Sequence, residues 1–183
     1  MINPCSLCDA KCCKTYTITV TIFDVLRICK NSGKKAEEFV FLNPLKILSY
    51  DPDMVIDTID QEGSYLLAIK SHPCIFLGKD NLCTIHEFAP LSCRRYPYQI
   101  NDKLNTRFCP IPSAIVFKIK GPDKPLNPLI AELEAHKKIV KKWNSKKGKK
   151  EEVLEFLINE ANQTQFEKPA VRHFSKNSSL KEE

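Results

Sequence analysis

Residues 5–13 read CSLCDAKCC, and the rest of the sequence is best interpreted outward from this stretch. Eight of the nine cysteines fall into two groups, one here and one in the middle of the chain. They are Cys5, Cys8, Cys12, Cys13, Cys74, Cys83, Cys93 and Cys109. Thiolates are strong soft ligands for zinc, iron and iron–sulfur clusters, and a Cys-x-x-Cys pair can face one ion from a tight turn. The pattern predicts a metal-binding domain in which Cys5 and Cys8 share such a turn.

The adjacent cysteines Cys12 and Cys13 are harder to assign. In an extended segment, neighbouring side chains point to opposite faces, so both thiols could hardly bind one small ion. Either Cys12 is the ligand and Cys13 packs as a small hydrophobe, or the two bind different metals, or they flank a larger cluster. The sequence leaves these three alternatives open.

The spacing of the central cysteines does not identify the metal. Eight residues lie between Cys74 and Cys83, nine between Cys83 and Cys93, and fifteen between Cys93 and Cys109. These are not zinc-finger spacings, and one Cys-x-x-Cys pair followed by long intervals suits an iron–sulfur cluster as well as a zinc site. The alternative without metal is a disulfide framework, which requires an oxidising compartment.

Several ordered motifs resemble those of a known family. Besides the cysteine stretch, they are TIFDVLRI at 21–28, PCIFL at 73–77, CTIH at 83–86 and PLSCRRYP at 90–97. Together, over residues 3 to about 112, they resemble the family known as CxxCxxCC, a zinc- or iron-chelating domain. That family is similar to a region of flagellin lysine N-methylase, for which an iron–sulfur cluster is the expected cofactor. The chain departs from the family shorthand by having three residues between Cys8 and Cys12.

Charged and imidazole side chains beside the cysteines are further candidates. Arg94 and Arg95 could lower thiolate pKa values and orient the sulfur ligands through N–H···S contacts, could bind an anionic substrate, or could pair with Asp or Glu at the surface. His72 and His86 flank cysteines, and an imidazole is a good zinc or iron ligand. Eight cysteines already suffice, however, and the position of His86 in the family pattern is often aromatic, which favours packing.

The hydrophobic pattern predicts an α+β fold: a small, irregular, cysteine-rich metal-binding domain of short strands and helices with a C-terminal helical appendage. A helix at 22–31 should begin at Thr21, with Asp24 in a capping box, and end at Gly33. The ninth cysteine, Cys29, lies on its apolar stripe and is expected to be a core thiol. The other predicted elements are strands at 15–20, 45–50, 55–59, 65–70 and 114–120, a hairpin at 74–85, and helices at 34–42, 91–95, 126–143 and 151–161.

The 183 residues suit one domain with an appendage. We place the metal-binding domain at 1–121, a basic helical appendage at 122–168 and a tail that is expected to be disordered at 169–183. The net charge is +6, and residues 111–183 hold 15 Lys and Arg against 10 Asp and Glu. No aromatic residues alternate with these lysines as base-stacking surfaces require, which disfavours a nucleic-acid partner and leaves an unidentified protein partner open.

The sequence also indicates a compartment. It has no apolar run of the length that a bilayer crossing requires, and the first residues lack the basic and apolar regions of a signal peptide. We therefore expect a cytoplasmic protein without a membrane span, in a compartment where thiols stay reduced and available to metal.

Three functions are compatible with these observations. The first is a metal-binding protein that holds an iron–sulfur cluster, of the 4Fe–4S type, or a zinc or iron ion, with a role in redox chemistry or metal handling. The second is a component of an enzyme of the lysine N-methylase type. The third is a zinc-stabilised nucleic-acid adaptor. No catalytic residue is identified, and the sequence lacks the strand, Gly-rich turn and helix of an ordinary cofactor-binding methyltransferase, so enzyme status stays open.

Overall fold

The computed structural model describes residues 7–45, 51–59, 63–70, 72–99, 103–105, 109–121 and 126–164. In these ranges the chain forms seven α-helices and a three-stranded antiparallel sheet, which confirms the predicted α+β class. The helices are α1 (Lys11–Thr15), α2 (Ile22–Ser32), α3 (Ala36–Phe39), α4 (Leu91–Arg95), α5 (Ile111–Lys120), α6 (Leu126–Lys146) and α7 (Val153–Gln163). The strands are β1 (Val40–Pro44), β2 (Ile56–Asp57) and β3 (Ser64–Ile69), and short 3₁₀ turns cover Pro52–Met54, His86–Phe88 and Lys150–Glu152.

The sheet has the order β1-β3-β2, with the longest strand in the centre. β1 pairs with β3 along its whole length, and Val40 lies opposite Ile69. The segment predicted as a strand at 15–20 joins the same sheet through a single bridge and backbone hydrogen bonds from Val20 to Leu67 and from Ile69 to Ile18, each of 3.0 Å. The chain therefore leaves the first cysteine group and runs directly onto the sheet.

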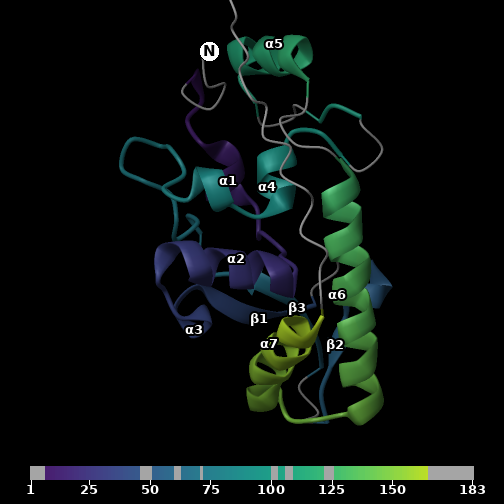
Figure 1. Ribbon diagram of the computed structural model, residues 1–183. Helices are drawn as coiled ribbons and strands as arrows, with labels where there is room; N and C mark the ends of the chain where they lie inside the picture. The colour runs from purple at the N-terminus through teal and green to yellow at the C-terminus, as the bar shows by residue number, and fades with distance from the viewer. Residues whose placement is uncertain are drawn as a thin grey trace, which may run out of the picture.

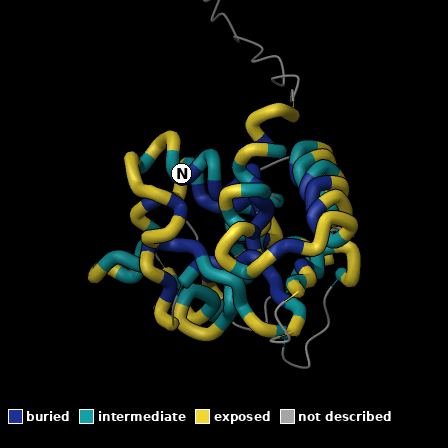
Figure 2. Tube along the Cα trace, turned by 90° about the horizontal axis from the view of Figure 1, so that it is seen from below, coloured by how far each residue is buried: buried dark blue, intermediate teal, exposed yellow. Residues whose placement is uncertain are grey.

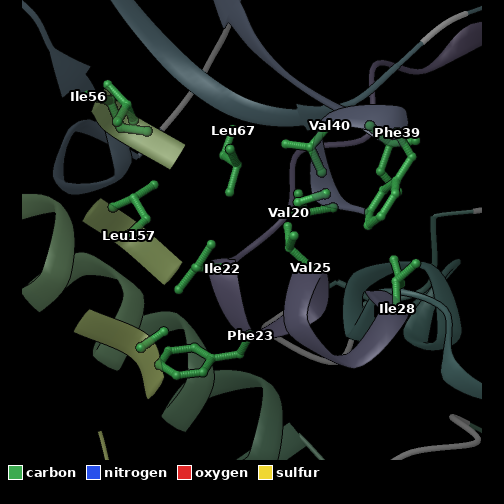
Figure 3. Packing of buried hydrophobic residues seen from close by; sticks show 14 of the residues in the cluster. Val20, Ile22, Phe23, Val25, Ile28, Phe39, Val40, Ile56, Leu67 and Leu157 are labelled. Atoms are coloured by element: carbon green, nitrogen blue, oxygen red, sulfur yellow. The ribbon is translucent and has the colours of Figure 1, made fainter. Parts of the chain in front are cut away.

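Helix α2 forms as its sequence predicts. The Thr21 side chain accepts a hydrogen bond from the Asp24 N–H, and the Asp24 carboxylate accepts one from the Thr21 N–H, so the capping box is complete. Gly33 ends the helix with a φ of +70°, which glycine adopts at no steric cost. One face of α2 is buried, and Figure 3 shows its Ile22 and Val25 facing Leu67 and Val40 of the sheet.

The hydrophobic core lies between the sheet, α2 and the two C-terminal helices. Trp143 of α6 is fully buried, and its indole N–H donates a 2.7 Å hydrogen bond to the carbonyl of Asp57 in β2. Leu157 of α7 is also fully buried and belongs to the same cluster as Ile22. Figure 1 shows α6 running along one side of the molecule and α7 at its lower end. In Figure 2 the buried stretches run through the interior and the exposed ones lie outside. The helices predicted at 126–143 and 151–161 thus share a core with α2 and the sheet.

Two predicted elements are wrong. The segment 114–120 is part of helix α5 and not a strand, because Pro112 in the first turn has a helical φ and Gly121 ends the helix with a φ of +73°. The helix predicted at 34–42 covers only Ala36–Phe39, and β1 begins at Val40. The strand predicted at 45–50 lies outside the described residues, apart from Leu45. The tail predicted at 169–183 lies wholly outside them. Over the described ranges, none of the helices is both long and apolar enough to cross a membrane.

Candidate metal centre

Cysteines from both sequence groups line one cavity of about 250 Å³. Two of them belong to α1, one precedes and one follows the turn at 78–81, and one lies in α4. They are Cys12, Cys13, Cys74, Cys83 and Cys93. Figure 1 shows α1 and α4 next to each other in the upper half of the molecule, between α5 and α2. The fold therefore brings the first and the central cysteine groups to one place.

A short helix explains how two adjacent cysteines can border one cavity. Cys12 and Cys13 lie in α1, which follows a left-handed turn at Ala10 (φ +57°). Successive side chains of a helix are separated by about 100° around its axis, and not by the 180° of a strand. Their sulfurs are 3.9 Å apart. The premise of an extended segment is wrong at this position, and it was the premise that made joint binding by these two thiols improbable.

The two middle cysteines are positioned by a hairpin-like turn. The Cys74 N–H donates a 2.8 Å hydrogen bond to the carbonyl of Cys13, which ties the turn to α1. Leu77 and Cys83 form an isolated antiparallel bridge, and the Thr84 N–H donates to the carbonyl of Phe76 at 2.9 Å. The predicted hairpin is thus present as a turn with one bridge and does not form regular strands.

The fifth thiol of the cavity is held by α4. This helix covers the predicted residues 91–95, and its first residue, Leu91, donates its N–H to the Asp24 carboxylate of α2 at 2.9 Å. Asp24 is itself fixed by the Thr21 N–H at 3.1 Å and by Arg27. Because α4 is anchored in this way, Cys93 has a defined position on the cavity wall.

The thiols influence one another electrostatically. A hydrogen bond between the Cys12 and Cys13 side chains lowers the pKa of Cys12 to about 7 and raises the pKa of Cys13. Burial raises the pKa values of Cys74, Cys83 and Cys93, and the nearby Cys12 thiol raises each of them further. Several thiolates so close together repel one another, and a bound cation would remove that repulsion and favour their deprotonation.

Two more predicted ligands lie beside the cavity without lining it. Burial raises the pKa of Cys109. The Tyr96 hydroxyl lowers this pKa, and the nearby thiols of Cys8 and Cys12 raise it. The Cys8 sulfur is 3.9 Å from the carboxylate of Asp9. Cys5 lies outside the described residues.

The described side chains do not form a closed coordination shell as they stand. Among residues 7–45, 51–59, 63–70, 72–99, 103–105, 109–121 and 126–164, no three or more Cys, His, Asp or Glu side chains could hold a metal ion in their present positions. The five thiols instead surround a space. As a donor set they fit zinc or iron, because both metals take thiolate ligands, and they must either close on an ion or enclose a larger group.

The ninth cysteine differs from the others. Cys29 does not line the cavity, is partly buried and packs against the hydrophobic core, as its place on α2 predicts. Burial raises its pKa. Each of the eight cysteines in the described ranges is a free thiol, so no disulfide links any two of them.

The arginine and histidine candidates occupy different surroundings. Arg94 and Arg95 do not line the cysteine cavity. Arg94 donates to the carbonyl of Glu87 at 3.2 Å, and its guanidinium and the Cys93 thiol interact electrostatically. His86 lines the cavity, whereas a ring nitrogen of His72 is 3.1 Å from the Thr17 hydroxyl.

Sequence reasoning missed two aromatic residues of the cavity. Tyr16 and Tyr96 line it and form an edge-to-face pair with ring centroids 6.1 Å apart. Burial raises the pKa of Tyr96, and the nearby Cys109 thiol adds to this effect. The signal was the position of each tyrosine three residues after a cavity cysteine, Cys13 in one case and Cys93 in the other.

Comparison with known proteins gives one match. The model of the CxxCxxCC family, described as "Putative zinc- or iron-chelating domain", matches residues 4–110. This range contains α1, the sheet and α4, and includes all eight cysteines of the two groups. No curated protein and no solved structure matches the chain.

Proposed function

Because the chain belongs to the CxxCxxCC family of zinc- or iron-chelating domains, we propose that the thiols around the cavity are its metal ligands. The observation that carries this proposal is the meeting of cysteines from α1, the turn at 78–81 and α4 at one cavity. These residues are far apart in the sequence, and five thiols that are buried or partly buried around a common space are well placed to share a ligand. Metal binding follows from the family, and the ligand set is our assignment.

The primary ligands are Cys12, Cys74, Cys83 and Cys93. Cys12 is the natural first ligand, since its pKa of about 7 makes it the thiol that most readily deprotonates, and its charge acts on the other three. Cys13 then donates a hydrogen bond to the Cys12 sulfur or serves as a fifth ligand. Arg94 supports the site from outside by its interaction with Cys93.

The remaining predicted ligands form a second, smaller group. Cys8 lies close enough to Cys109 to raise its pKa, and Cys5 forms a Cys-x-x-Cys pair with Cys8 in the sequence. We assign these three residues to a second site or to the completion of the first one. Since thiols bind metal only while they stay reduced, we expect the protein to work in the cytoplasm.

The space between the thiols favours a cluster over a single ion. A zinc ion would require four sulfurs at about 2.3 Å, whereas the five thiols border a cavity of about 250 Å³. An iron–sulfur cluster of the 4Fe–4S type carries its own sulfide and fills such a space, and when bound it supplies one-electron redox chemistry. Ile18, Ile69 and Phe76 line the same cavity and would keep water from it, which is how a protein tunes the potential of such a group.

The test is purification under anaerobic conditions, followed by visible absorption, iron and zinc analysis and an assay for acid-labile sulfide. We expect a brown protein that contains iron and sulfide. A colourless protein with zinc would overturn the cluster and keep the metal site, and a metal-free folded protein would overturn both.

Variants locate the site. Cys83→Ser and Cys93→Ser should each lower the bound metal per folded chain by at least about tenfold. Cys29→Ser is the matched control, because Cys29 lies on α2 outside the cavity and should leave the metal content unchanged. Equal metal loss in all three variants would contradict the assignment.

A further inference from the structure

Helix α5 has a defined inner side and a defined outer side. Ser113 and Phe117, four residues apart on the same side of the helix, are buried. The Phe117 carbonyl accepts a 2.5 Å hydrogen bond from the Tyr98 hydroxyl, which fixes this inner side to the segment after α4. Ile115 follows Ser113 by two residues and therefore lies about 200° from it around the helix axis. It belongs to the outer side.

The outer side of α5 is a row of exposed isoleucines. Ile111, Ile115 and Ile119 follow one another at intervals of four residues, which places them on one stripe, and they are 76%, 53% and 81% exposed. Single exposed isoleucines are ordinary on a protein surface, whereas several that adjoin one another mark a surface that contacts a partner or a membrane. Figure 1 shows α5 at the upper end of the molecule, above α4. The isoleucine stripe is thus accessible to a large, flat surface.

The charge of the segment around α5 has one sign. Residues 103–122 contain four Lys and Arg and no Asp or Glu, although the whole chain has 22 acidic residues against 28 basic ones. Lys118 is exposed, and its position lies about 60° around the helix axis from Ile115, at the edge of the isoleucine stripe. Positive charge beside an exposed apolar row complements a surface that is anionic outside and apolar beneath, as a bilayer with anionic lipids is.

The composition of this surface favours a bilayer over a protein partner. Protein–protein contacts draw most of their binding energy from Trp, Tyr and Arg. Among the residues of α5 whose exposure the structure describes, the exposed ones are Ile111, Pro112, Ile115, Lys118 and Ile119. Aliphatic side chains can insert among acyl chains, which need no shaped pocket. The ten residues of α5 span about 15 Å against a hydrocarbon thickness of about 30 Å, so the helix would lie on the membrane and not cross it.

We propose that α5 docks the protein on an anionic membrane surface. Ile111, Ile115 and Ile119 enter the acyl-chain boundary, and Lys118 lies at the level of the lipid phosphates. Anionic lipids face the cytoplasm, which is the compartment expected for this protein. The inference goes beyond the proposed metal function and does not depend on it, because none of the residues that carry it is a proposed metal ligand.

The first test is co-sedimentation of the full chain, as purified, with lipid vesicles. One set consists of phosphatidylcholine, and the other is an equimolar mixture of phosphatidylcholine and phosphatidylserine. We expect the protein to bind the anionic vesicles at least about tenfold more tightly, and this preference to weaken as the salt concentration rises. Equal binding to both kinds of vesicle, or no binding to the anionic ones, would overturn the proposal.

Variants separate docking by α5 from adsorption through the net charge of +6 alone. Ile119→Ser should weaken binding to the anionic vesicles by about tenfold, and Ile115→Ser, at a less exposed position, by about threefold. Ile59→Ser is the matched control and should bind like the unchanged protein. Ile59 is 53% exposed, as Ile115 is, but it lies beside Gly148, to whose carbonyl its N–H donates at 3.1 Å. Equal binding by all three variants would overturn the role of α5.

A tryptophan on the stripe reports insertion directly. Lipids brominated in their acyl chains quench the fluorescence of an indole that lies among them, so anionic vesicles of such lipids should quench Ile119→Trp and not Ile59→Trp. Trp143 is fully buried and contributes the same background to both variants. Equal fluorescence in the two would overturn the proposal.

Sedimentation of lipid-free protein tests a second copy of the chain as the occupant of the stripe. We expect a monomer, both with Ile119 and in Ile119→Ser. A dimer that Ile119→Ser converts to a monomer, with vesicle binding unchanged, would show that the stripe joins two copies and would overturn membrane docking.

Discussion

The two ends of the molecule are held together by different means. At one end, α2, the sheet, α6 and α7 enclose fully buried side chains such as Ile22, Trp143 and Leu157. At the other end, α1 and α4 are five residues long, and no residue of α1 is buried. There the chain is arranged around five thiols and a cavity. Burial of apolar surface stabilises the first end. The same core extends into the second end through Phe76, Ile85 and Ala89, but the short helices around the cavity are expected to depend in addition on their ligand.

Defined contacts join the two ends. The Asp24 carboxylate of α2 accepts the N–H of Leu91 in α4, and the segment after α1 bonds to β3 through Val20. Asp24 is buried and belongs to the capping box of α2. A helix of the core therefore positions the helix that carries Cys93.

Removal of the metal should produce the largest difference in local stability between the two ends. After treatment with a chelator under reducing conditions, we expect amide hydrogen exchange in residues 72–99 to accelerate by about a hundredfold, which is roughly 3 kcal/mol of local stability. Exchange in α6 and α7 should stay the same, because their protection comes from apolar packing. Mass spectrometry of peptides from the metal-loaded and the metal-free protein measures both regions at once. Uniform acceleration across the chain would show that the ends are not independent.

A mutation in the core should have the opposite result: it should lower the stability of the fold and leave metal binding unchanged. Leu157→Ala removes a fully buried side chain and should lower the free energy of unfolding by about 2–5 kcal/mol. The metal bound per folded chain should not change, since Leu157 lies in α7, outside the cavity. Urea unfolding and elemental analysis measure the two quantities. Ile115→Ala is the control, because Ile115 on α5 is exposed and its loss should cost less than about 0.5 kcal/mol.

Local signals in the sequence were sufficient to predict part of the fold. Thr21, Asp24 and Gly33 specify the start and the end of α2 through interactions within a few residues, and the structure confirms them. The helix predicted at 91–95 likewise matches α4, whose N-cap is Pro90. These elements were predictable because their capping groups are adjacent in the sequence and their chemistry is specific.

Composition was misleading where tertiary context decides. The β-branched and apolar residues of 114–120 favour a strand, but only part of this segment is buried: Phe117 faces the interior, and Ile115 and Ile119 are exposed. Phe117 is held in place through its carbonyl, which accepts a 2.5 Å hydrogen bond from the Tyr98 hydroxyl. A contact across 19 residues leaves no periodic trace in the sequence.

The sequence was sufficient to predict that the site binds metal, but not how its cysteines are arranged. Clustered cysteines and the family motifs indicated metal binding, and the family match confirms that much. The position of Cys12 and Cys13 on a helix depended on the left-handed turn at Ala10, a conformation that alanine rarely adopts and that the sequence did not reveal.

A buried histidine allows the smallest and most selective test of the core. His136 of α6 is fully buried, accepts a 3.3 Å hydrogen bond from the Ile22 N–H, and has a pKa that burial lowers from 6.5 to about 4. Between these two values the unfolded chain binds a proton that the folded chain does not, so stability falls as the pH falls, by up to about 3 kcal/mol. His136→Gln keeps a hydrogen-bond acceptor but cannot titrate, and its stability should fall less over the same range. Urea unfolding of both proteins between pH 7 and pH 4 measures the difference, in which the effect of acid on the thiolates cancels because both proteins contain them. Parallel pH profiles would show that His136 does not contribute to the acid sensitivity, which would then come from other groups, such as the thiols and the Asp51 carboxylate that pairs with Lys137.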